Sequence, residues 1–78
     1  MEIKLNDFIV ADNEVCGGKP VFKGTRIMVW QVLELLGTGV SIDEIIRDYF
    51  PQLTKESILS LLKYASQIIE EEKYVVLD

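Results

Sequence analysis

One stretch near the N-terminus decides how this 78-residue sequence folds, and it reads Cys16-Gly17-Gly18-Lys19-Pro20-Val21-Phe22-Lys23-Gly24-Thr25-Arg26-Ile27. It holds three of the five glycines and one of the two prolines. The paired glycines permit positive φ angles, and Pro20 suits the first residue of a strand. We therefore predict a turn at residues 17–18, a short strand over residues 20–23, and a second turn at Gly24-Thr25 that leads into a helix.

Working outward, one strand is predicted before this stretch and three helices after it. Residues 7–12 read as a short strand in which Phe8 and Val10 alternate with Ile9 and Ala11. Apolar residues at helical spacing then predict helices over residues 28–36, 42–50 and 55–71. The first of these is apolar around most of its circumference, which predicts burial on several sides.

Helix boundaries follow from the residues between these patterns. Ser41 and Glu44 fit a capping box, and Thr54 fits a cap of the third helix. Gly37 and Gly39 are expected to end the first helix, and Pro51 the second. The expected fold class is mainly α: a short N-terminal β-hairpin followed by a three-helix, homeodomain-like helix-turn-helix bundle.

The length predicts a single domain over residues 1–78. We divide it into a β-hairpin arm (residues 1–27), a trihelical helix-turn-helix unit (residues 28–72) and a β-prone tail (residues 73–78).

The composition argues against several classes of function. There is no His and one Cys, so neither a zinc site nor an intrachain disulfide is expected, and Cys16 lacks the usual catalytic base. The order Lys23-Gly24-Thr25 differs from the Gly-Lys-Thr of a phosphate-binding loop. We therefore expect no enzyme, no metal, no cofactor and no small-molecule substrate. No apolar run is long enough for a membrane span and no signal peptide is recognised, so a cytoplasmic protein is predicted.

Apolar residues make up 49% of the chain, which is high for so small a domain. Part of this apolar surface is expected to contact another chain, which predicts a homodimer, a different protein partner, or both.

The charge distribution suggests two further contacts. The net charge is −5, yet residues 16–30 carry three basic side chains and no acidic one. Basic and hydroxyl side chains here and on the third helix are candidate DNA contacts. They are Lys19, Lys23, Arg26, Lys55, Ser57, Ser60 and Lys63. A purely structural role stays open, with glycines forming turns, Thr25 capping and Arg26 tethering the turn.

The C-terminus combines acidic and β-prone residues. The acids fall at the end of the third helix, where the helix dipole disfavours anions, so either fraying of this end or a compensating basic partner is expected. The candidate partner-binding residues are Glu70, Glu71, Glu72, Tyr74, Val75, Val76 and Leu77.

The glycine-rich stretch, together with the helical pattern that follows it, resembles the prokaryotic domain-of-unknown-function family 433. Its signature is matched by Gly18, Pro20, Gly24, Thr25 and Arg26. The resemblance implies a VapB-like antitoxin with a helix-turn-helix fold. Such a protein neutralises a PIN-like nuclease toxin and is expected to bind its own promoter. Many members have Pro where this chain has Met28.

Two alternatives to the antitoxin remain at this stage. One is a stand-alone DNA-binding transcription regulator that uses the third helix. The other is a purely structural dimerisation module.

Overall fold

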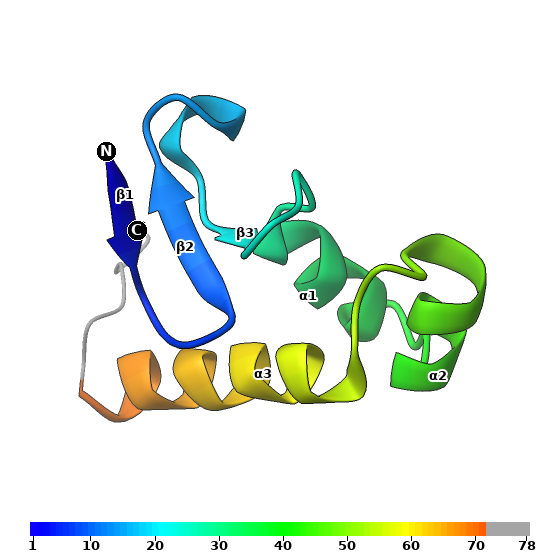
Figure 1. Cartoon of the computed structure of the whole chain (residues 1–78). Coiled ribbons are helices and arrows are strands. Elements are labelled where there is room, and N and C mark those ends of the chain that lie inside the picture. The colour runs from blue at the N-terminus through cyan, green and yellow to red at the C-terminus, as the bar shows by residue number, and fades with distance from the viewer. Residues whose placement is uncertain (72–78) are drawn as a thin grey trace.

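The computed structural model describes residues 1–71 (Figure 1). It consists of a small antiparallel sheet with a short 3-10 turn, η1, and three helical segments: α1, α2 continued by η2, and α3. The elements in chain order are β1 (Glu2–Lys4), β2 (Ile9–Asp12), η1 (Cys16–Gly18), β3 (Val21–Phe22), α1 (Val29–Gly37), α2 (Ile42–Glu44), η2 (Ile45–Tyr49) and α3 (Lys55–Glu70). The predicted tail at residues 73–78 lies outside the described residues.

The sheet has three antiparallel strands in the order β1-β2-β3. Glu2 pairs with Asp12 and Ile9 pairs with Phe22. The mainly α prediction with a two-stranded hairpin is therefore wrong. Strand β1 was missed because its three residues are all exposed, so no alternation of buried and exposed positions marks it in the sequence.

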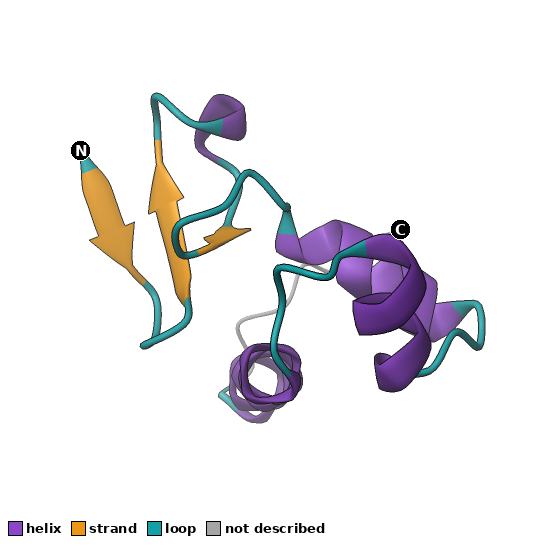
Figure 2. Cartoon of the chain, turned by 45° about the vertical axis from the view of Figure 1, so that its right-hand side comes forward, coloured by secondary structure: helices purple, strands orange, loops and turns teal. Residues whose placement is uncertain are grey.

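The sheet and the helices share one hydrophobic core, as the two layers in Figure 2 indicate. Ile9 and Phe22 from the sheet are fully buried against residues of all three helical segments. The helical members of the core are Val29, Val32, Ile45, Ile58 and Leu61, and Leu53 joins them from the turn before α3. The helices thus do not form a bundle of their own, so the predicted three-helix bundle is wrong as a fold class: the sheet completes the core.

Helix α1 begins and ends one residue later than predicted. Met28 is its N-cap, and the Met28 N–H donates to Gln31 Oε1 at 3.2 Å. At the other end Gly39 has a φ of 98°, and its N–H donates to Leu36 O at 3.1 Å. The Val40 N–H donates to Leu35 O at 3.1 Å, which completes a Schellman motif.

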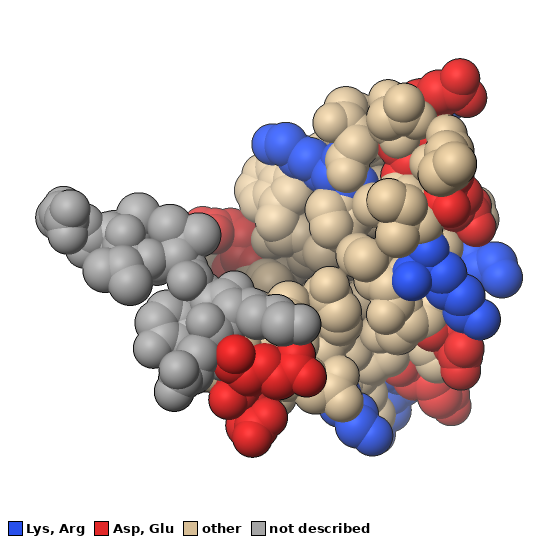
Figure 3. Space-filling view, turned by 90° about the vertical axis from the view of Figure 1, so that its left-hand side faces the viewer, with Lys and Arg blue, Asp and Glu red and all other residues tan. Residues whose placement is uncertain are grey.

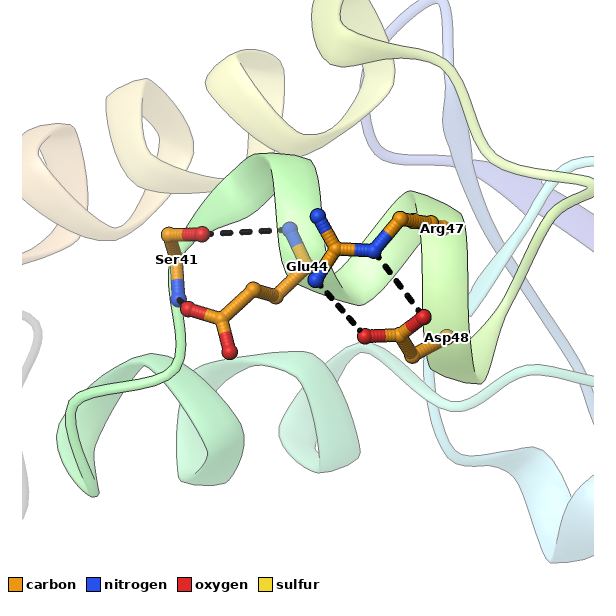
Figure 4. Close-up of polar contacts among 4 residues, drawn as sticks. All are labelled: Ser41, Glu44, Arg47 and Asp48. Atoms are coloured by element: carbon orange, nitrogen blue, oxygen red, sulfur yellow. Dashed lines mark hydrogen bonds and ion pairs between the residues drawn. The ribbon is translucent and has the colours of Figure 1, made fainter.

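The second predicted helix is an α-helical turn followed by a π-helical turn. The Ser41–Glu44 capping box is confirmed by bonds of 3.1 and 3.3 Å (Figure 4). The helix then widens into a π-helical turn, at the end of which the Phe50 N–H donates to Ile45 O at 2.7 Å. Pro51 disfavours helical geometry at Phe50, whose φ and ψ are −132° and 77°. The wider last turn lets the chain leave the helix there.

An ion pair lies on the outer surface of η2. Arg47 donates from Nε and Nη2 to the two carboxylate oxygens of Asp48, at 3.0 and 2.9 Å (Figure 4). These bonds lower the pKa of Asp48 and raise that of Arg47. Because the pair is solvent-exposed, it contributes little to stability.

Helix α3 is the longest element and begins where predicted. The Thr54 hydroxyl accepts from the Ser57 N–H at 3.2 Å, which confirms Thr54 as the cap. The Ser57 hydroxyl accepts from the Thr54 N–H and donates to the Thr54 carbonyl. Within residues 1–71, no helix combines the length and apolarity needed to cross a membrane.

Candidate functional site

The glycine-rich stretch folds into a small hairpin, which we call the signature hairpin (residues 18–28). Val21 forms a β-bridge with Met28, and the Phe22 N–H donates to Ile27 O at 3.0 Å. The Val29 N–H donates to the carbonyl of Pro20 at 3.0 Å. The hairpin therefore connects β3 directly to α1.

Thr25 and Gly24 form the tip of this hairpin. The Thr25 hydroxyl donates to Phe22 O at 2.8 Å and accepts from the Ile27 N–H at 3.0 Å. Gly24 has a φ of 79°, which a residue with a Cβ adopts only with strain. Both residues thus serve the geometry of the turn.

The hairpin is entered through a left-handed turn at η1. Cys16, Gly17 and Gly18 have φ angles of 50°, 66° and 86°. The thiol of Cys16 donates to the Arg26 carbonyl at 3.6 Å, which ties η1 to the hairpin tip. Because glycine adopts positive φ angles with little strain, Gly17 and Gly18 suit the turn that joins β2 to β3.

Two hollows follow the side of α3 that faces the β1–β2 loop. The first has a volume of about 270 Å³ and brings Lys23 to Thr54 at the start of α3. The second, of about 260 Å³, includes Ser60 and Lys63. Asp7 and Phe8 line both hollows, so Phe8 separates two adjacent depressions.

The loop between β1 and β2 is held in place against α3. Asn6 Oδ1 accepts the N–H groups of Phe8 and Ile9 at 2.7 and 2.8 Å, and Asn6 Nδ2 donates to Ser60 O at 3.4 Å. Sequence reasoning missed these loop residues because it assigned residues 7–8 to a strand. The Asn6-Asp7 pair was the available turn signal.

The structure does not gather all seven candidate DNA contacts. Lys23, Ser57, Ser60 and Lys63 line the hollows along α3, and Lys55 and Arg26 are exposed. Ser57 is 7% exposed and its hydroxyl is engaged by Thr54. Lys19 directly follows η1, which lies at the opposite end of the molecule from α3 (Figure 1).

Charges of both signs lie on the face of the molecule that Figure 3 shows. Figure 3 shows basic and acidic side chains interspersed on one face, with no broad basic area there. The basic candidates that do meet at α3 therefore form a narrow strip beside Asp7, which is itself paired with Lys4 at 3.2 Å.

The C-terminal half of α3 leaves apolar and acidic side chains exposed together. Leu62 and Ile69 are 38% and 65% exposed and lie seven residues apart, two turns along one side of the helix. Glu70 ends the helix and Glu71 caps it, and the last turn contains no basic residue. We call these four residues the acidic α3 end. The other partner-binding candidates, Glu72 and Tyr74 to Leu77, lie outside the described residues.

Helix α1 also has an exposed side. Trp30 and Leu33 are 49% and 37% exposed, so the prediction of burial on several sides is wrong for the isolated chain. Together with Glu34 and Gly37 they form what we call the α1 outer face, which contains a hollow of about 420 Å³. In the sequence, the apolar residues around most of this helix indicated that one of its faces could be left uncovered.

Metal ligands do not cluster in the part of the chain that the structure describes. Within residues 1–71 there is no group of three or more His, Cys, Asp or Glu side chains that could hold a metal ion.

The chain belongs to the family described as proteins of unknown function (DUF433), whose model matches residues 9–65. The resemblance that rests on Gly18, Pro20, Gly24, Thr25 and Arg26 is thereby confirmed. The match runs from β2 to residue 65 of α3 and includes only Leu62 of the acidic α3 end. No curated protein and no solved structure matches the chain.

Proposed function

We propose that this protein is an antitoxin-like binding protein whose acidic α3 end holds a basic partner protein, of the kind expected of a nuclease toxin. One observation carries the proposal. Two exposed apolar side chains, Leu62 and Ile69, lie on one side of α3, and Ile69 immediately precedes Glu70 and Glu71. An apolar centre with a charged rim is the usual composition of a protein–protein interface.

The electrostatics of the helix end support a basic partner. The dipole of α3 places partial negative charge at its C-terminus, and Glu70 and Glu71 add to it. A cationic surface would therefore be attracted to this end and would relieve the repulsion among the carboxylates. The sequence adds a third carboxylate at Glu72.

The test is binding of the purified full-length chain to the product of the adjacent gene. Charge reversal in Glu70→Lys is expected to weaken the complex at least tenfold, and Ile69→Asp should do the same by removing an apolar contact. Isothermal titration calorimetry measures both. A nuclease assay on the partner then reports whether binding neutralises it.

Glu14→Lys is the matched control. It changes the net charge by the same amount as Glu70→Lys, but it lies in the turn that leads into η1, far from α3 (Figure 1). If Glu14→Lys weakens the complex as much as Glu70→Lys, attraction is a matter of net charge alone and the proposed surface is wrong. Wild-type affinity in both α3 variants would also overturn the proposal.

A second candidate is DNA binding along the same helix. It is favoured by the hollow that places Lys23, far away in sequence, beside Thr54 at the first turn of α3. Lys63 continues the line in the second hollow. Lys23 and Lys63 thus place two cations along one side of α3, where they can contact DNA phosphates. The net charge of −5 opposes a broad DNA surface.

Salt-titrated binding to the DNA upstream of the gene tests this second function. Each of Lys23→Ala and Lys63→Ala should weaken binding and reduce the slope of log K against log salt by about 1. Lys19→Ala, at the other end of the molecule, is the control and should leave the slope unchanged. Equal effects of all three substitutions, or no binding to DNA, would refute a contact along α3.

A further inference from the structure

Strand β1 has a free edge, on the side of the sheet away from α1 and α2 (Figure 1). The Leu5 N–H donates to Ile9 O at 2.9 Å, toward β2, and Ile3 belongs to the same register. Because successive residues of a strand direct their N–H and C=O groups to opposite sides, those of Glu2 and Lys4 point away from β2. The free edge therefore presents main-chain donors and acceptors that can pair with a further strand.

The residues along this edge complement themselves in the antiparallel direction. Met1, Ile3 and Leu5 are apolar and alternate with one acid, Glu2, and one base, Lys4. If two copies run antiparallel with Ile3 opposite Ile3, Met1 lies opposite Leu5 and Glu2 lies opposite Lys4, on both sides of the centre. Apolar residues thus meet apolar ones and each acid meets a base, which is the pairing that stabilises a sheet.

The charges around Glu2 favour a second copy as the occupant of this edge. Glu2 lies directly opposite Asp12 across β1 and β2, and like charges at such positions are destabilising. Within residues 1–71 Glu2 takes part in no ion pair, whereas Asp12 pairs with the Met1 ammonium and Lys4 pairs with Asp7. The Lys4 ammonium has three donors, so it can bond Asp7 and a further carboxylate. Lys4 of a second copy would therefore supply the cation that Glu2 lacks.

We propose that two copies of this chain associate through the free edges of β1, about a two-fold axis at Ile3, and join their sheets into one. Glu2 of each copy then exchanges both main-chain hydrogen bonds with Lys4 of the other, and their side chains form an ion pair. At the axis Ile3, which is 58% exposed in the single chain, packs against Ile3 of the other copy. This contact uses neither the acidic α3 end nor the hollows along α3, so it is independent of the function proposed above.

The position of α3 leaves room for the second copy. This helix lies at the end of β1 that leads into the β1–β2 loop, where Asn6 Nδ2 donates to Ser60 O (Figure 1). The two-fold axis inverts the second copy, so its α3 lies at the opposite end of the strand pair. The shared edge is three residues, or about 10 Å, long. A weak dimer, with a dissociation constant on the order of 100 µM to 1 mM, is therefore expected.

Sedimentation equilibrium of the full chain between about 10 µM and 2 mM measures the dimer, and amide hydrogen exchange locates it. As dimers form, exchange at the N–H groups of Glu2 and Lys4 should slow, because these donors become bonded across the axis. The Ile3 N–H points to β2 and should change much less. A monomer at every concentration, or exchange at Glu2 and Lys4 that does not depend on concentration, would overturn the proposal.

Exchanging the two charges tests the register. Glu2→Lys and Lys4→Glu each place like charges opposite each other at both ends of the strand pair, so each should weaken the dimer at least tenfold. The double substitution keeps the net charge at −5 and should restore the dimer. An equimolar mixture of the two single variants should also dimerise, because acid again meets base at every pair. Circular dichroism checks that each variant is folded, as expected for a strand whose residues are all exposed.

Lys55→Glu is the matched control for Lys4→Glu. It changes the net charge by the same amount, at an exposed position that begins α3, far from β1 (Figure 1). It should change the dissociation constant much less than Lys4→Glu does. Equal weakening by the two substitutions would refute pairing along β1 and attribute the effect to net charge. The proposal would likewise be refuted if neither the double variant nor the mixture regained the dimer.

Discussion

The signature hairpin and the acidic α3 end use their side chains in opposite ways. In the hairpin, Phe22 is buried in the core, and the Thr25 hydroxyl makes two hydrogen bonds within the turn. At the α3 end, Leu62 and Ile69 are exposed, and Ile69 immediately precedes Glu70 and Glu71. The hairpin residues are thus committed to the fold, whereas Leu62 and Ile69 of α3 leave apolar side chains exposed to solvent.

This difference separates family membership from function. Four of the five signature residues, Gly18, Pro20, Gly24 and Thr25, have backbone angles or hydrogen bonds that the hairpin requires. They identify the chain because a turn of this kind tolerates few residue types. They do not themselves indicate what is bound.

The largest effect that the comparison predicts is on stability. Phe22→Ala should lower the free energy of unfolding by about 3–5 kcal/mol, because it leaves a cavity in the core. Ile69→Ala, at an exposed position, should change it by less than about 0.5 kcal/mol. Urea unfolding monitored by circular dichroism measures both. Similar losses for the two variants would remove the distinction between the regions.

A smaller effect is expected at the tip of the hairpin. Thr25→Val removes the hydroxyl that bonds Phe22 O and the Ile27 N–H, and should cost about 1–2 kcal/mol. Thr25→Ser keeps the hydroxyl and should cost less than about 0.5 kcal/mol. Urea midpoints distinguish the two variants. If valine and serine are equivalent, the hydroxyl does not stabilise the turn.

Two glycines should respond to alanine with opposite signs. Gly24→Ala forces a Cβ into a φ of 79° and should destabilise by about 1 kcal/mol. Gly37→Ala, at a helical and open position, should stabilise the monomer by up to about 1 kcal/mol. Thermal melts at low protein concentration provide the comparison. A loss of stability in Gly37→Ala would show that the chain itself needs this glycine.

The smallest effect concerns Asp12, at the end of the strand that leads into η1. Its carboxylate accepts the Glu14 N–H at 2.9 Å, and this bond lowers the pKa of Asp12 below its usual value of 3.8. A lowered pKa stabilises the fold above the unfolded value, and this contribution is lost as pH falls through the folded value. Asp12→Asn should therefore flatten the decrease in urea midpoint between about pH 5 and pH 3. An unchanged acid dependence would contradict a role for this carboxylate.

Local patterns in the sequence were sufficient for the caps at Ser41 and Thr54, for the turn at Gly24-Thr25 and for the family. Ser41, Thr54 and Gly39 act within a few residues of their own positions, so their roles can be inferred without knowing the fold. These local patterns did not predict the elements whose backbone geometry depends on neighbouring parts of the fold. Strand β1 has no buried residue to mark it, and the π-helical turn at η2 arises from how the chain leaves the helix before Pro51.

The sequence by itself determined the signature turn, the helical periodicity, the net charge of −5 and the acidic residues that end α3. Only the tertiary structure decided which apolar residues are covered. Helix α1 is apolar around most of its circumference, and the sheet and α3 cover one side of it, which leaves Trp30 and Leu33 in solvent. The same packing brought Lys23 to the start of α3. Burial and long-range proximity depend on how elements distant in sequence pack, and local patterns carry no information about that packing.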